Sequence, residues 1–430
     1  MIARLLARVG LVTPEQRAWA WYDWANSVYF TTVITAVFPS FYSTYAAKGL
    51  EPAQASARFA FITTVSVLII ALLAPILGAL ADYSGMKKRL LGIFMTIGVT
   101  SCALMVLIGE GDIMLASVLF FVGNIGVSGS TVFYDSLLPH VARPEETDRV
   151  SSAGYAMGYV SGGVLLLINL WWILSPATFG FANAASATRA AFVSVAIWWA
   201  VFSIPLFKNV PEPPADASGQ SGLAIGAAFI RLGQTFREIR RYKHAFLLFI
   251  AMVLYQDGIQ TVIRMSSVYG AEVGINQNAQ IGAFVMVQFV GIPCAFLFGA
   301  LGTRIGTRRC IFIAIGVYVV AAALAYFMTS VLHFFLLAFL VALVLGGSQA
   351  LSRALFARLI PQNRTSEFFG FYAVSERFAT VFGPAMFWLS VMLTGSSRAA
   401  ILGIIGLFIA GAWVLSLVDE AEGERAALVN

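Results

Sequence analysis

Long apolar runs separated by short polar segments set the pattern of this chain. Runs such as 59–81 and 311–327 contain few polar positions, and their length matches the roughly 20 residues that an α-helix needs to cross a membrane. Neither run alternates apolar and polar residues as a transmembrane β-strand does. The pattern therefore predicts an all-α membrane protein. We expect twelve transmembrane helices, near residues 18–45, 58–81, 90–109, 113–138, 151–174, 187–207, 244–269, 279–302, 309–330, 333–357, 367–394 and 399–418.

One long polar segment divides the predicted spans into two groups of six. The expected organisation is an N-terminal six-helix bundle over 1–207, a cytoplasmic linker over 208–242 and a C-terminal six-helix bundle over 243–430. Apolar residues in the second part of the linker recur at spacings of three and four, which is typical of a helix with one apolar face. This helix lies either on the cytoplasmic membrane surface or against the inner face of the protein.

Composition and charge narrow the class of protein. With 59% hydrophobic and 11% charged residues, the chain is not an ordinary soluble domain. If the N-terminus is inside, cytoplasmic segments hold 20 of the 27 Lys and Arg residues, as the positive-inside rule requires. We therefore expect both termini in the cytoplasm. The net charge of +6 reflects this topology and does not indicate nucleic-acid binding.

Enzyme chemistry has little support in the sequence. The three cysteines and three histidines are isolated, without the spacing of a metal site or a disulfide framework. No phosphate-binding G-x-x-x-x-G-K-[ST] loop occurs. We expect no cofactor, no metal and no enzymatic activity, and energy from a gradient.

The loops after the second and eighth predicted spans repeat one another. Small residues allow helix ends to approach closely, the central glycine allows a tight reversal, and the charges form a relay. Such a relay would hold the two bundles in one of two orientations. The second loop has Thr303 where the first has Asp82. The candidate gating residues are Gly78, Asp82, Gly85, Lys87, Lys88 and Arg89 in the first loop and Gly299, Arg304, Gly306, Arg308 and Arg309 in the second.

These paired loops resemble the signature of the major facilitator superfamily, over essentially the whole chain. Further segments resemble the bacterial transporters similar to the autophagy-related vacuolar amino-acid effluxers. They are Trp21–Ser27, Phe133–Pro139, Arg149–Ser151, Gly158–Gly163, Gly346–Arg353 and Phe368–Tyr372. The resemblance implies two pseudo-symmetric six-helix bundles, alternating access, a monomer, and export of small solutes. Asp135 stands where that family usually has asparagine, which adds a protonatable group.

Charged residues inside a membrane are costly and usually face a cavity or a partner. Asp23 lies in the first span beside Tyr22, with Asn26 on the same helical face. We expect Asp23 to be a proton or cation carrier, a ligand for a substrate ammonium, or a structural acid. Asp257, Gln260 and Arg264 share one face of the seventh span; they line the pathway, or Asp257 and Arg264 form an internal ion pair.

The tenth and eleventh spans add further candidates. Arg353 follows Gln349 by one helical turn, and its guanidinium suits a substrate carboxylate or phosphate. The alternative is that Arg353 neutralises Glu376, or that Glu376 and Arg377 form a structural pair. Asp135, near the cytoplasmic end of the fourth span, is expected to form a gating or structural salt bridge.

Cationic and anionic side chains in the spans together favour a zwitterionic cargo. The sequence predicts a proton-coupled secondary transporter that exports a small polar or zwitterionic solute, such as an amino acid, across the bacterial cytoplasmic membrane. The expected partners are membrane lipids, the solute and protons. An uncoupled facilitator, a lipid or lysolipid flippase and a sensor with the same fold stay open as alternatives.

Overall fold

A computed structural model describes residues 6–7, 10–50, 52–215, 240–275, 277–378, 386 and 398–428. The regular structure of these residues is helical. The elements of the first half are α2 (Pro14–Val28), η1 (Tyr29–Ala36), α3 (Phe38–Phe41), η2 (Tyr42–Ala46), α4 (Pro52–Ser84), α5 (Lys87–Leu104), η3 (Met105–Leu107), α6 (Ile113–Ser136), α7 (Leu138–Val141), α8 (Thr147–Leu174), η4 (Pro176–Phe179) and α9 (Ala184–Asn209). Those of the second half are α11 (Lys243–Glu272), α12 (Gln277–Ile305), α13 (Thr307–Tyr326), α14 (Val331–Arg358), η5 (Gln362–Arg364), α15 (Thr365–Phe378), α17 (Arg398–Ser416) and α18 (Glu420–Leu428).

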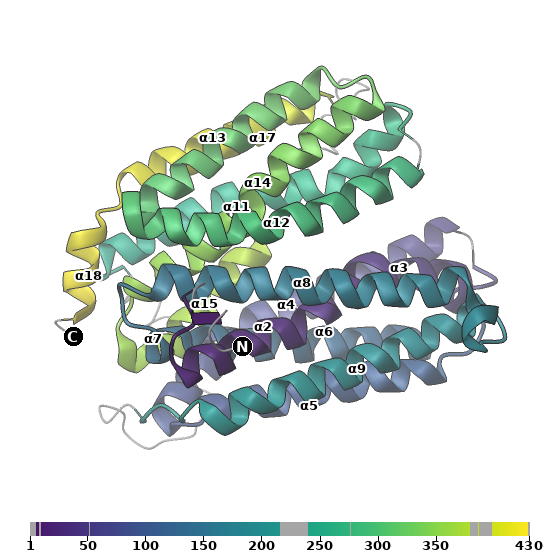
Figure 1. The fold of residues 1–430 in the computed structure, drawn as a ribbon, viewed down its shortest axis with the longest axis horizontal. Coiled ribbons are helices and arrows are strands. Elements are labelled where there is room, and N and C mark those ends of the chain that lie inside the picture. Colours follow the sequence, from purple (N-terminus) through teal and green to yellow (C-terminus); the bar gives the residue numbers. More distant parts are fainter. Residues whose placement is uncertain are drawn as a thin grey trace.

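The two halves of the chain form two bundles, one above the other in Figure 1. Contacts between the bundles run chiefly along two lines: α4 packs against α15, and α8 packs against α12 and α14. The N-terminal helix α2 and the C-terminal helix α18 both lie toward the same end of the molecule (Figure 1). The predicted linker helix falls at 216–239, outside the described residues.

Within the described ranges, eight helices are long and apolar enough to cross a membrane, and nine if the pair Ala400–Ser416 and Glu420–Leu428, bent by 61°, counts as one span. The count of twelve stays a prediction. The first predicted span is divided among α2, η1, α3 and η2, so it does not contain one long helix. The eleventh includes 379–385 and 387–397, which the structure does not describe.

The first span is broken near its middle by a change of backbone geometry. A capping box starts α2: the Thr13 hydroxyl accepts from the Gln16 N–H, and the Gln16 side chain accepts from the Thr13 N–H. The chain then widens into π-helix over Tyr29–Ala36. Pro39 follows in α3, and because it has no N–H it cannot continue the helical hydrogen bonds. π-helical turns of this kind occur frequently at functional sites.

Candidate functional site

Arg353 joins the two bundles at a buried site. It belongs to α14 of the second bundle and is 3% exposed. Its Nη1 donates to Oδ1 of Asp135 at 3.0 Å, and its Nη2 donates to Oδ2 of Asp23 at 3.3 Å. Its Nε donates to the Ser151 hydroxyl at 2.9 Å, and Nη2 also donates to the Ser151 carbonyl at 3.0 Å. Asp23, Asp135 and Ser151 come from α2, α6 and α8 of the first bundle; we call these four residues the Arg353 cluster.

Aromatic rings surround the guanidinium of Arg353. Its Cζ lies 4.4 Å from the ring centre of Tyr155, 4.8 Å from that of Trp19 and 5.7 Å from that of Tyr134, within cation–π range. The Tyr134 hydroxyl donates to Oδ2 of Asp23 at 2.7 Å. The Trp19 ring stacks on Tyr134 and donates its Nε1–H to the Tyr134 carbonyl. These rings exclude water, which strengthens the electrostatic attraction between Arg353 and the carboxylates.

Two glycines of α8 allow α2 to come close enough for this contact. A Cβ atom on Gly154 would lie 2.3 Å from Oδ2 of Asp23 and 3.4 Å from Nη2 of Arg353. A Cβ atom on Gly158, one turn later, would lie 2.4 Å from the Ser27 hydroxyl. A side chain at either position would displace the Asp23 carboxylate or the Ser27 hydroxyl, or move α2 away from α8.

The structure thus brings together two of the predicted pathway residues, Asp23 and Arg353, with the predicted gating residue Asp135. Asp135 forms a salt bridge with Arg353, and a role of this pair in gating stays a prediction. Tyr22 packs on Tyr134 with ring centres 4.9 Å apart. Sequence reasoning did not select Trp19, Tyr134, Ser151, Gly154 or Tyr155 as site residues, although Tyr134 and Ser151 lie in segments that carry the family resemblance. The repeat of glycine at 154, 158 and 162 was the available signal for a close helix contact.

Other predicted pathway residues lie outside the Arg353 cluster. Asp257 is fully buried in α11 and Asn26 is 3% exposed in α2, while Gln260 and Gln349 are half-buried. The side chains of Arg264, Glu376 and Arg377 lie outside the described residues. Their roles, and the proposed pairing of Asp257 with Arg264, therefore stay predictions.

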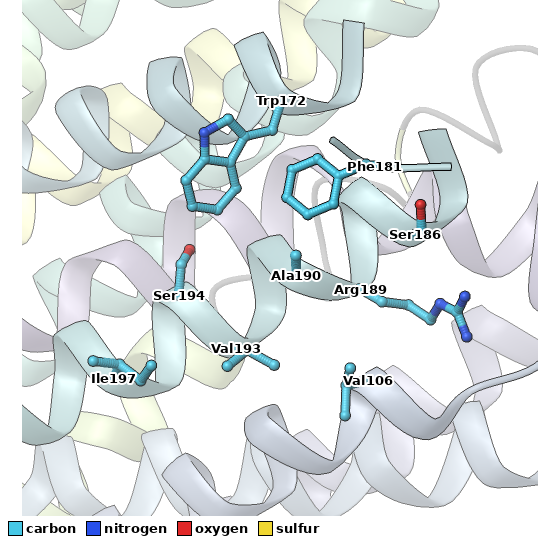
Figure 2. Close-up of a pocket in the computed structure, with 9 residues that line it drawn as sticks. All are labelled: Val106, Trp172, Phe181, Ser186, Arg189, Ala190, Val193, Ser194 and Ile197. Carbon is cyan, nitrogen blue, oxygen red and sulfur yellow. The ribbon is translucent and has the colours of Figure 1, made fainter. Parts of the chain in front are cut away.

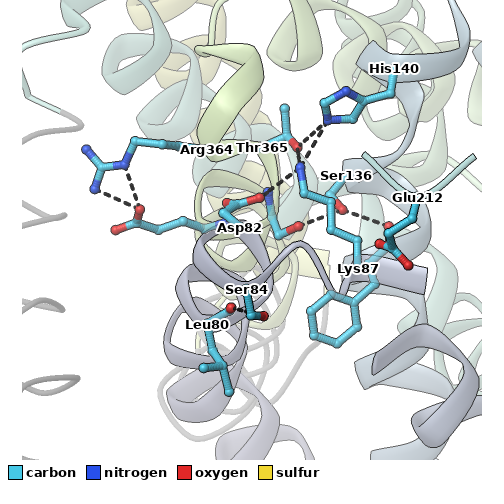
Figure 3. Close-up of polar contacts among 12 residues, drawn as sticks. Leu80, Asp82, Ser84, Lys87, Ser136, His140, Glu212, Arg364 and Thr365 are labelled. Carbon is cyan, nitrogen blue, oxygen red and sulfur yellow. Dashed lines mark hydrogen bonds and ion pairs between the residues drawn. The ribbon is translucent and has the colours of Figure 1, made fainter. Parts of the chain in front are cut away.

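A second cluster joins the first repeated loop to α15, and Figure 3 shows its contacts. Asp82 and Lys87 are each 1% exposed and lie 2.8 Å apart. The carboxylate of Asp82 accepts from the backbone N–H groups of Ser366 and Glu367 at 3.1 and 2.8 Å. These N–H groups open the first turn of α15, where negative charge is favoured. The Lys87 ammonium also donates to the Thr365 hydroxyl at 2.7 Å. We call this set the Asp82 cluster.

The remaining residues of the first loop serve the close approach to α15, the turn, or the first bundle itself. A Cβ on Gly78 would lie 2.1 Å from the Ser366 carbonyl oxygen, so glycine is required where α4 touches α15. Gly85 has a φ of +61° and ends α4 in a tight reversal. Lys88 donates to the Val210 carbonyl, and Arg89 is exposed. The contact between the bundles therefore uses Lys87 and not the whole basic group.

The second repeated loop also takes part in a contact between the bundles. Here the carboxylate comes from the opposing helix and not from the loop. Thr303 donates to the Ala300 carbonyl of its own helix. The acid is Asp148 of α8, whose Oδ2 accepts from the Thr307 hydroxyl at 2.7 Å and whose Oδ1 accepts from Nη1 of Arg358 at 3.0 Å. We call Asp148, Thr307 and Arg358 the Asp148 cluster. The two loops thus share a position but not a charge arrangement, because the carboxylate belongs to the loop in one case and to the opposing helix in the other.

The basic residues of the second loop contribute little to this contact between the bundles. Arg308 donates its backbone N–H to Glu420 at 2.8 Å and its Nη1 to the Val418 carbonyl, within the second bundle. Arg304 and Arg309 are exposed. Gly306 has a φ of +94°, and a Cβ on Gly299 would lie 2.6 Å from that of Ser152. The glycines set the approach of α12 to α8, and Arg358 supplies the charge.

All three clusters hold the bundles together toward one end of the molecule. Asp82 and Lys87 flank the turn between α4 and α5, and Asp148 lies in the first turn of α8. Arg353 precedes Arg358 by five residues, or about 7.5 Å along a helix. The Arg353 cluster therefore lies farther from this end of the molecule than the Asp148 cluster. Separating the bundles at this end must break the ion pairs of Arg353 and of Asp148, and the hydrogen bonds that Asp82 and Lys87 make to α15. The described geometry is therefore that of a molecule closed on the side of its termini.

Comparisons with known proteins agree with this architecture. The model of a family described as "Vacuole effluxer Atg22 like" matches residues 49–428. YxiO of Bacillus subtilis (strain 168), an uncharacterised MFS-type transporter, is 37% identical over 410 residues that cover 95% of each chain. Autophagy-related protein 22 of Coccidioides immitis (strain RS) is 24% identical over 450 residues, which cover 86% of this chain and 74% of that protein.

Solved structures show the same arrangement of helices. The human organic anion transporter MFSD10 (TETRAN) superposes with a TM-score of 0.72 at 14% identity, covering 94% of this chain and 99% of that one. The proton:xylose symporter XylE superposes with a TM-score of 0.70 at 13% identity, covering 97% and 98%. At such identities the likeness concerns the fold alone.

Proposed function

Because the chain belongs to the Atg22-like family and has the major facilitator fold, we propose that it is a proton-coupled transporter that exports a small zwitterionic solute, such as an amino acid. Membership of this family makes it an integral membrane transporter and not an enzyme. The proposed setting is the bacterial cytoplasmic membrane with both termini inside, and the proposed mechanism is alternating access of twelve helices.

The balance of charge in the Arg353 cluster is the observation that carries this proposal. One guanidinium faces two carboxylates, Asp23 and Asp135, so the ionised cluster has an excess of one negative charge. Uncompensated charge is costly in a buried site. One proton removes the excess, whereas a zwitterion, which has no net charge, leaves it unchanged. Protonation of either carboxylate also weakens one of the two ion pairs between the bundles, and so favours their separation on the cytoplasmic side.

The same cluster offers complementary ligands to a zwitterion. The carboxylate of an amino acid can replace an aspartate on the planar guanidinium of Arg353, which binds carboxylates through two parallel hydrogen bonds. The aspartate released in this way can then accept from the ammonium of the solute. A molecule with both groups exchanges one ion pair for two without leaving a buried charge alone. The direction of transport is proposed from the effluxer description of the matching family.

Flux in proteoliposomes tests the proposal. The purified chain is reconstituted with an imposed pH gradient, and uptake and release of radiolabelled amino acids are followed in the wild type, Asp23→Asn and Arg353→Lys. The matched control is Glu110→Gln, which removes a carboxylate from an exposed pair with Lys48 on the same bundle. We expect gradient-driven flux to fall at least tenfold in the two cluster variants and to be unchanged in the control.

Each alternative has its own outcome in this assay. Flux that ignores the pH gradient in the wild type would identify a facilitator, and binding without flux would identify a sensor. Transfer of fluorescent lysolipid between leaflets, unaffected by Asp23→Asn, would identify a flippase. Full gradient-driven flux in both cluster variants would contradict the proposed role of Arg353.

A further inference from the structure

An open cavity lies on the surface of the first bundle, at the end opposite the three clusters. It has a volume of about 570 Å³ and forms where the end of α8, the start of α9 and η3 meet. In Figure 2, Arg189 and Ile197 of α9 lie at the two ends of the cavity, and Trp172 faces α9. The charge pattern assigns this end of the molecule to the outer side of the membrane. Because every lining residue belongs to one bundle, the cavity is separate from the proposed solute pathway.

One end of the cavity is cationic and has no partner among the residues that the structure describes. The Nε–H of Arg189 is buried and donates to no partner among the described residues. No ion pair of Arg189 occurs within the part of the chain that the structure describes. A guanidinium is well suited to bind a phosphate group. A buried donor without a partner costs free energy. A phosphate at this position would remove this cost by accepting a hydrogen bond from the Nε–H.

The other end of the cavity is apolar and open to the surface. Val193 and Ile197 continue along α9, and Ile197 is 59% exposed. Val106 of η3 faces them and is 38% exposed. From Ser186 to Ile197 the lining follows α9 for about 16 Å, close to half of the roughly 30 Å hydrocarbon core of a bilayer. Its polar end lies near the start of α9, where the helix emerges from the membrane.

We propose that this cavity binds a phospholipid of the outer leaflet, with its phosphate on Arg189 and an acyl chain along Val193 and Ile197. Charge and depth identify the occupant. The cation lies at headgroup level, and the apolar lining extends inward for the depth of one leaflet. Trp172 lies at the same level, where tryptophan is favoured at the membrane interface. A free anion would use the cationic end alone and would leave the apolar lining empty.

Thermal unfolding of the full chain in mixed micelles tests this site, because a ligand that binds the native state raises its apparent stability. The probes are phosphatidylglycerol, diacylglycerol with the same acyl chains, and inorganic phosphate. The variants are Arg189→Gln, which removes the charge, and Ala190→Trp, which fills the cavity and keeps the charge. The control is Lys48→Gln, which removes a positive charge from the same predicted side outside the cavity.

We expect phosphatidylglycerol to raise the unfolding temperature of the wild type and of the control equally. Each cavity variant should lose at least half of this increase. Two variants that act on charge and on space separately keep the test valid if one of them does not fold. Equal increases in all four proteins would overturn the site. An equal effect of diacylglycerol would overturn phosphate recognition, and an equal effect of inorganic phosphate would show an anion site without a lipid.

Discussion

Replacing Gly154 by alanine should release the contact between the bundles at Arg353. The new Cβ would lie 2.3 Å from Oδ2 of Asp23 and 3.0 Å from Cζ3 of Trp19. Ordinary contacts begin near 3.4 Å, so the carboxylate must move by about 1 Å, or α8 must separate from α2. Oδ2 of Asp23 already lies 3.3 Å from Nη2 of Arg353, and this displacement takes the pair out of hydrogen-bonding range.

The expected cost falls on the closed state. Overpacking of this kind costs about 1–3 kcal/mol. The clash lies within the first bundle, but in the open state the Asp23 carboxylate can rotate away from residue 154, whereas in the closed state the same movement breaks its pair with Arg353. The equilibrium between closed and open cytoplasmic sides should therefore shift by about 5- to 150-fold toward the open state. The same substitution also stabilises the interior of α8 by about 1 kcal/mol, because alanine has a higher helix propensity than glycine. This gain is opposite in sign to the destabilisation caused by the clash.

Gly316→Ala is the control that separates the two effects. Gly316 lies inside α13, and a Cβ there meets no atom within 4 Å, so this variant gains helix propensity without a clash. Spin labels on the exposed positions Arg89 and Arg309, in a background with the native cysteines replaced by alanine, report the separation of the two loops by pulsed electron resonance. We expect a larger long-distance population in Gly154→Ala than in Gly316→Ala. Identical distance distributions in the two variants would refute the steric reasoning at Gly154.

Three further substitutions test the other contacts. Lys87→Met leaves the carboxylate of Asp82 buried without its cation, which should cost the closed state about 3–5 kcal/mol; adding Asp82→Asn should recover part of the loss in the same distance measurement, and no recovery would argue against their pairing. Asp135→Asn keeps an oxygen acceptor for Arg353 but removes a protonatable group. It should therefore retain solute flux while changing its pH dependence, and an unchanged pH profile would remove Asp135 from the coupling. Gly85→Leu should slow transport more than it weakens solute binding, since the left-handed conformation costs a branched residue about 1–2 kcal/mol; Gly85→Asn, which tolerates this conformation, should be milder, and equal rates would show that the turn is not limiting.

The gating loops show how far a repeat can be interpreted from sequence. The shared glycine and the basic residues indicate a tight turn next to charge, and Gly85 and Gly306 both have the positive φ that such a turn uses. The repeat does not reveal which side supplies the carboxylate. Asp82 belongs to the loop, whereas Asp148 approaches from α8, and this difference appears only when the opposing helix is in place.

Local features of the chain were accessible from sequence alone. Apolar runs of membrane-spanning length, the distribution of Lys and Arg, and the costly acids within the spans all indicate a helical membrane transporter. These signals depend on transfer of each segment from water to lipid, and each segment carries its own free energy of transfer. For the same reason Asp23, Asp135 and Arg353 could be selected as candidates one at a time.

Only the tertiary structure decides which of these charges meet. Asp23 and Arg353 are separated by 330 positions in the sequence, and their contact depends on the approach that Gly154 allows between α2 and α8. A spacing rule operates within one helix, where residues three and four apart share a face, and it does not extend to another helix. Pairing across the bundles depends on backbone separation and on side-chain packing, which no single segment contains. The buried Nε–H of Arg189, which has no partner among the described residues, is likewise visible only once α8, α9 and η3 form the open cavity beside it.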